Sequence, residues 1–226
     1  MINLTDIIQG TINSEGLKKY LINLLKTKKN IVVDSDNNYV LRWAVYYNHI
    51  EIVKELLKFD EVNTCDSNYH AFELSIETSN IEIFKLLYSD YRTKKHIDGV
   101  FNLSISKCLD YNNVKILKYL LSNSYNVKQY NNKVFDNIIF LSNYDYLKRL
   151  DFINILLYDK RFDPSYNNNS VLHIAIVNEK YEYIRLLLKN REVISKIYKL
   201  SNRYINKLIN MKLIPNYKNN KTERLL

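Results

Sequence analysis

The sequence predicts an all-α fold, a solenoid of stacked helix–turn–helix repeats with short turns or hairpins between the repeats. The main observation is an apolar phrase that ends in a leucine pair and returns at a nearly fixed period. The recurring leucines follow one another after 31, 33, 36 and 31 residues and are Leu56, Leu87, Leu120, Leu156 and Leu187. A period in this range is typical of stacked repeats, in which no single repeat can bury its own apolar face. The chain has only 3 Gly and 2 Pro in 226 residues, which argues against a flexible linker that would divide it.

Each repeat is expected to contain two short antiparallel helices. In the first full repeat, an apolar cluster at residues 40–45 precedes the one at residues 50–57, and both have helical spacing. A small residue recurs in the first helix, where it would let two helices approach closely; these residues are Ala44, Ser75, Cys108 and Ala175, with Leu141 as the exception. Asn is frequent before and between the helices, which suits turns because Asn tolerates the left-handed backbone conformation.

The repeats define the expected organisation of the chain. We expect an N-terminal capping unit over residues 1–30, C-terminal capping helices over residues 189–212 and a basic polar tail over residues 213–226. In the N-terminal unit, Leu17–Leu25 aligns with the second helix of an atypical repeat. The spacing of 36 residues places an insertion in the fourth repeat, within residues 143–150. The five full repeats are expected at residues 31–64, 65–97, 98–130, 131–164 and 165–188.

These repeats resemble the ankyrin repeat over roughly residues 31–188. The best match to the family's Thr-Pro-Leu-His-x-Ala phrase is Ser170-Val171-Leu172-His173-Ile174-Ala175, whereas the middle repeats have lost that phrase. The family's second phrase is well matched by Asn48-His49-Ile50-Glu51-Ile52-Val53. The resemblance implies a rigid, non-catalytic scaffold for protein–protein interaction that binds its partner through a concave face. The degenerate repeats and the composition resemble ankyrin proteins of giant DNA viruses, which implies a host protein as the partner.

Other features of the sequence limit the function classes. The N-terminus lacks the pattern of a signal peptide, no apolar run approaches the ~18 residues of a membrane helix, and 2 cysteines offer no disulfide framework. We therefore expect a cytoplasmic or nuclear protein without membrane contact, in the host cell if the protein is viral. No catalytic set, nucleotide fingerprint or metal-spaced His pair is recognisable, so we expect no enzymatic activity, no cofactor and no metal. We also expect a monomer.

The net charge of +9 belongs to the C-terminal segment. Residues 189–226 contain ten Lys or Arg and two Glu, so the remaining residues are nearly neutral. A basic stripe lies opposite the apolar positions of this segment and consists of Lys196, Lys199, Arg203 and Lys207. The simpler interpretation is the solvated face of a cap, and the alternative is a surface for nucleic acid or another anion. A further alternative is a ubiquitin-ligase adaptor, although no F-box-like sequence follows residue 190.

Tyrosine is the most suggestive residue type for a binding face. The chain has 20 Tyr against 8 Phe, and Tyr is favoured at protein interfaces because it combines a large ring with a polar tip. Codon usage is the competing explanation. The positions that align with the turn tips and the solvent side of the first helices are the predicted partner-binding residues: Asp36, Asn38, Tyr46, Tyr47, Tyr69, Glu77, Asn102, Asp110, Tyr111, Lys133, Phe135, Tyr144 and Tyr166.

Overall fold

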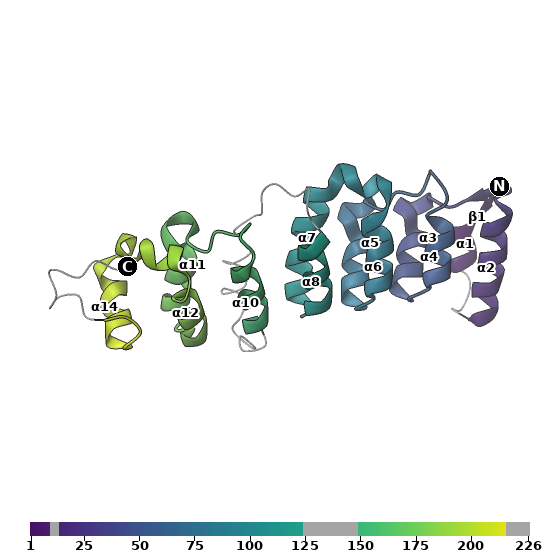
Figure 1. Ribbon diagram of the computed structural model, residues 1–226. Coiled ribbons are helices and arrows are strands. Elements are labelled where there is room, and N and C mark those ends of the chain that lie inside the picture. The colour runs from purple at the N-terminus through teal and green to yellow at the C-terminus, as the bar shows by residue number, and fades with distance from the viewer. Residues whose placement is uncertain (10–13, 124–148, 216–226) are drawn as a thin grey trace. The chain divides into compact units, whose positions relative to one another are not determined.

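The computed structural model describes residues 1–9, 14–123 and 149–215 (Figure 1). The chain divides into two compact units, Met1–Val127 and Lys128–Leu226. The described regular structure is helical apart from two short strands, β1 (Ile2–Asn3) and β2 (Ile31–Val32), which pair in parallel with Ile2 opposite Ile31. The predicted all-α stack of helix pairs is therefore confirmed.

The described residues of the first unit form four consecutive helix pairs. Its first helices pack in the order α1, α3, α5, α7, and its second helices in the order α2, α4, α6, α8 (Figure 1). The 3₁₀ helix η1 (Tyr91–His96) connects the third pair to the fourth. The helices of this unit are α1 (Leu4–Gln9), α2 (Glu15–Thr27), α3 (Ser35–Tyr46), α4 (Ile50–Leu56), α5 (Asp66–Glu77), α6 (Ile81–Ser89), α7 (Ile97–Asp110) and α8 (Val114–Asn123).

The N-terminal capping unit, residues 1–30, contains two helices, α1 and α2. The sequence pattern revealed only the second of them. Ser14 caps α2 by accepting a hydrogen bond from the backbone N–H of Leu17 at 3.2 Å. The additional helix α1 packs on α3, with Leu4 and Ile8 buried. It escaped the periodic pattern because a helix of 6 residues shows too little of a repeat to be recognised.

The second unit has one described full pair and a helical end. Its helices are α10 (Leu150–Tyr158), α11 (Tyr166–Val177), α12 (Tyr181–Leu187), α13 (Arg191–Ser195), the 3₁₀ helix η3 (Ile197–Lys199) and α14 (Asn202–Asn210). Helix α11 pairs with α12, α10 packs on α12, and α14 packs on α11. Leu141 and residues 143–148 of the predicted insertion lie outside the described residues.

The period of the sequence corresponds to the core of the structure. All five recurring leucines, from Leu56 to Leu187, have no exposed surface. The small residues Ala44, Ser75, Cys108 and Ala175 are likewise fully buried, where the first helices approach their neighbours. Burial raises the pKa of the Cys108 thiol, as expected for an inert core cysteine.

Among the described residues, three consecutive left-handed residues interrupt the start of helices α3, α5 and α11, at 36–38, 67–69 and 167–169. Two of these triplets end on an Asn whose side chain points inward. Asn38 donates to the Asp66 carboxylate at 2.6 Å and accepts from the Asn63 N–H at 2.9 Å. Asn169 donates to the Val193 carbonyl at 3.0 Å. These amides therefore join each repeat to the next one, in a backbone conformation that Asn tolerates better than most residues.

Candidate functional site

The first helices α3, α5 and α7 end on equivalent residues, which form two parallel rows because these helices pack side by side. We call this surface the helix-end row; it consists of Tyr46, Glu77 and Asp110 in one line and Tyr47, Thr78 and Tyr111 in the other. The tyrosines are well exposed for large apolar residues, at 50% for Tyr46, 45% for Tyr47 and 38% for Tyr111. The helix-end row thus combines aromatic and acidic side chains on one stack.

At the tyrosine end of the helix-end row, buried rings pack against the exposed Tyr47. The Trp43 ring lies 5.6 Å from that of Tyr47 and 4.8 Å from that of His49, and Tyr46 packs edge-on against Tyr47 at 5.0 Å. Burial lowers the pKa of His49, and the Lys18 charge lowers it further, against a smaller opposing effect of Glu15. The sequence pattern did not identify Trp43 and His49 as parts of this site, because it assigned Trp43 to the core.

The other end of the helix-end row is acidic. The Lys107 ammonium pairs with Glu73 at 2.7 Å and lies 3.7 Å from Asp110. Burial raises the pKa of the Tyr111 hydroxyl, and the nearby carboxylates of Glu77 and Glu73 raise it further. This end thus carries three carboxylates and one lysine, so it retains a net negative charge.

The remaining predicted partner-binding residues have mixed positions. Asp36, Asn102 and Tyr166 are exposed. Asn38 is buried, so its assignment to the binding face is wrong; its amide is used between repeats. Tyr69 is half-buried against α7, where a side chain at Gly99 would collide with its ring, so it fills space between helices and is not part of the helix-end row. Lys133, Phe135 and Tyr144 lie outside the described residues.

The basic stripe is partly neutralised. Lys196 donates to the Ser165 hydroxyl at 2.7 Å, and Lys207 pairs with Glu179 at 2.9 Å. The hydrogen bond from Lys207 lowers the pKa of Glu179. Lys199 and Arg203 are exposed. Two of the four predicted basic residues therefore hold the C-terminal helices against the preceding repeat.

The structure bears on metal binding and on membrane spanning within residues 1–9, 14–123 and 149–215. There, no group of three or more His, Cys, Asp or Glu is placed to hold a metal ion. Over the same ranges, no helix has both the length and the apolar character that a membrane span requires.

Comparison with known families identifies the N-terminal repeats. A family model described as "Ankyrin repeats (3 copies)" matches residues 11–98, which is less than half of the chain. The comparison thus finds ankyrin repeats over residues 11–98. The match begins within the N-terminal helix pair, upstream of residue 31, and the stacked pairs have the architecture of an ankyrin-like solenoid. Ankyrin repeats are generally protein–protein interaction modules and generally non-catalytic.

One further similarity is to a much larger protein. A DNA-directed RNA polymerase subunit beta from Eimeria tenella is 25% identical over 186 residues. The alignment covers 76% of this chain and 17% of that protein, so this chain spans only a small part of the relative's length. No solved structure matches this chain.

Proposed function

We propose that this chain is a non-catalytic scaffold that binds a partner protein through the helix-end row. The observation that supports this most strongly is the exposed pair Tyr46 and Tyr47 on a buried base of Trp43 and His49. Rings held in this way lose little conformational entropy on binding, and Tyr and Trp are the residues most enriched at binding hot spots.

The charge of the helix-end row defines the partner's chemistry. Glu77 and Asp110 are exposed beside Tyr111, and Glu73 is only partly compensated by Lys107. A complementary surface would present apolar or aromatic groups to the tyrosine end and Lys or Arg to the acidic end. The similarity to the polymerase subunit supports no activity of its own, because it is low and covers a small part of that protein.

We further propose a host-cell protein as the partner, acting in the cytoplasm or nucleus, with the chain as a monomer. This rests on the composition and the degenerate repeats, which favour a viral origin. Affinity capture from cells that contain the protein, followed by mass spectrometry, would supply the partner for the quantitative test below.

Changing Tyr46 and Tyr111 together to Ala is expected to weaken partner binding by ~1–3 kcal/mol per residue and to leave the melting temperature nearly unchanged. Tyr47 is left in place because it packs on the buried rings. Titration calorimetry with the purified partner measures the effect. Tyr198→Ala is the matched control, since Tyr198 is 71% exposed on the C-terminal unit. Unaltered affinity in the double variant would exclude the helix-end row as the binding face.

The alternative is binding of nucleic acid or another anion through the basic C-terminal segment. If this segment binds polyanions, Lys199→Ala with Arg203→Ala should lower heparin affinity and reduce the slope of log K against log salt concentration by about 1–2. Heparin chromatography and salt-dependent titrations measure both. Negligible heparin binding by the unmodified protein at low salt would remove this alternative. The ubiquitin-ligase adaptor has no F-box-like sequence to support it.

A further inference from the structure

The outer helix α4 ends in a socket that a guanidinium group fills. Arg92 donates to the backbone carbonyls of Phe59 at 2.6 Å, Val62 at 2.7 Å and Leu57 at 3.0 Å. It also forms a two-point ion pair with Asp90, with both distances at 2.7 Å. The socket suits a cation because the last carbonyls of a helix carry partial negative charge, and the planar fork of Arg reaches several acceptors together.

The same backbone geometry occurs one hundred residues later, at the end of α10. The Val62 N–H donates to the Phe59 carbonyl at 3.2 Å, and the Phe162 N–H donates to the Asp159 carbonyl at 3.0 Å. The Asp90 carboxylate accepts from the N–H two residues later, and the Asn190 amide accepts from the Glu192 N–H, both at 3.0 Å. The three carbonyls around Arg92 therefore correspond to those of Leu157, Asp159 and Phe162.

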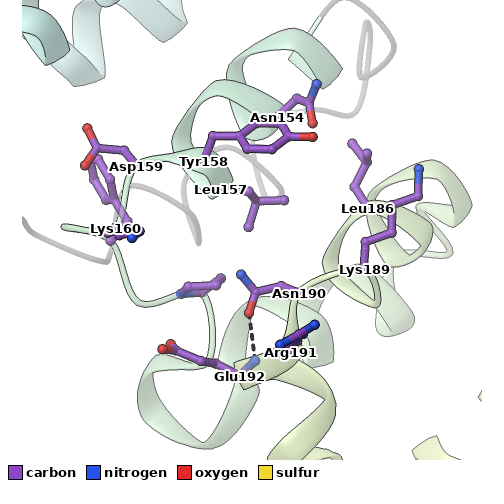
Figure 2. Close-up of a pocket in the computed structure, with 12 residues that line it drawn as sticks. Asn154, Leu157, Tyr158, Asp159, Lys160, Leu186, Lys189, Asn190, Arg191 and Glu192 are labelled. Carbon is purple, nitrogen blue, oxygen red and sulfur yellow. Dashed lines mark hydrogen bonds between the residues drawn. The ribbon is translucent and has the colours of Figure 1, made fainter.

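The residue that corresponds to Arg92 in this second socket is Glu192, which has no hydrogen to donate to a carbonyl. A cavity of about 640 Å³ is present at this place (Figure 2). Figure 2 shows Leu157 and Asn190 facing each other across it, with Glu192 below them. Leu157, Asp159, Phe162, Asn190 and Glu192 all belong to its lining. Within residues 149–215, no side-chain nitrogen donates to the Leu157 carbonyl in the structure.

The first repeat also has Glu in place of Arg at the equivalent position, and it also has a cavity there. There the residue corresponding to Arg92 is Glu61, and a cavity of about 420 Å³ is lined by Glu61, Phe59 and Lys28. The Lys28 ammonium contacts the other wall of this cavity, since it lies 3.5 Å from the Lys58 carbonyl and 5.4 Å from the Phe59 ring centroid. Glu in place of Arg thus coincides with an open cavity in both units.

We propose that the cavity at Leu157, Asp159, Phe162 and Glu192 is an arginine socket, which binds the guanidinium group of an arginine side chain from a partner protein. The guanidinium donates to the carbonyls of Leu157 and Asp159, and Glu192 supplies a carboxylate at the mouth. The aliphatic part of the incoming arginine packs against Leu157 and Leu186. This site is separate from the helix-end row and does not depend on it.

The rim of the arginine socket also bears Lys160, Lys189 and Arg191. The net charge of the lining therefore does not favour a cation, and the selectivity must come from directed hydrogen bonds to the carbonyls. This predicts a preference for the planar fork of Arg over the compact ammonium of Lys. It also identifies the competing ligand, an anion held by the three rim cations.

Filling the socket from within the chain provides the first test. Asn190→Asp with Glu192→Arg rebuilds the Asp-x-Arg arrangement of Asp90 and Arg92, which also occurs at Asp159 and Arg161. This rebuilt double variant is expected to raise the melting temperature by about 2–4 °C, the shift that one additional kilocalorie per mole gives in a chain of this size. Glu192→Met, which removes the charge without adding a hydrogen-bond donor, should give a smaller change. No rise in the rebuilt double variant would show that the two sockets are not equivalent.

Direct binding provides the second test. The probe is the acetylated, amidated peptide Gly-Gly-Arg-Gly-Gly, titrated into the full chain and followed by the backbone amide signals of Leu157, Asp159 and Asn190. The expected result is saturable binding, weakened about tenfold or more when citrulline or lysine replaces arginine, because each loses part of the charged fork. The rebuilt double variant, whose own guanidinium would occupy the socket, should not bind the peptide.

Three outcomes would overturn the proposal: equal binding of the citrulline peptide, saturation by phosphate in place of the arginine peptide, or unchanged binding by the rebuilt double variant. Because these measurements need no partner protein, their failure is distinguishable from a failure of the helix-end row, which Tyr46 and Tyr111 test.

Discussion

Replacing Arg92 by Met is expected to lower the free energy of unfolding by about 3–5 kcal/mol, the range for breaking a buried ion pair from one side. The side chains of Arg92 and Asp90 are only 12% and 7% exposed. The substitution removes the donor from three carbonyls and leaves the Asp90 carboxylate without its partner. The hydrogen bond and the charge of Asp90 raise the pKa of the Arg92 guanidinium, which therefore stays charged throughout the working pH range. Urea unfolding followed by circular dichroism measures the loss.

Two further variants show how much of that loss comes from the unpaired Asp90 charge and whether it exceeds the loss from an exposed ion pair. Adding Asp90→Asn to Arg92→Met should recover part of the stability. The amide oxygen of the new Asn side chain still accepts a hydrogen bond from the backbone N–H of residue 92, but the side chain carries no charge to bury. Arg185→Met is the matched control, because Arg185 forms an exposed pair with Glu182 and such pairs contribute ~0–1 kcal/mol. A loss in Arg92→Met no larger than in Arg185→Met would show that the socket contributes little.

Replacing Leu120 by Ala is expected to lower the free energy of unfolding by about 2–5 kcal/mol. Leu120 is fully buried in α8, which packs on α6 and α7, so its removal leaves a cavity that neighbouring side chains cannot fill completely. The exposed Lys118 on the same helix is the control, and Lys118→Ala should change stability by less than about 0.5 kcal/mol. Equal effects of the two substitutions would contradict the assignment of the leucine period to the core.

The core and the helix pairs could be predicted from sequence because their cause is periodic. A leucine at a repeating position is buried in every repeat, since each repeat covers the apolar face of the previous one. The small residues such as Ala44 and Cys108 follow from the same packing. The exposure of Tyr46, Tyr47 and Tyr111 could be predicted too, because these residues fall on the helical face opposite the core.

The orientation of polar side chains required the tertiary structure. Asn38 and Asp36 stand in the same polar turn, yet only Asn38 turns inward, because Asn63 at the end of the same repeat and Asp66 of the next repeat supply its hydrogen-bond partners. Tyr69 resembles the exposed tyrosines in sequence but faces Gly99, which leaves room for its ring. Arg92 reaches carbonyls 30, 33 and 35 residues earlier in the chain. Neither these hydrogen bonds nor the correspondence of Glu192 to Arg92 therefore follows from the local sequence pattern. Apolar burial depends on the repeat itself, whereas a polar group depends on which particular partner the neighbouring repeat presents.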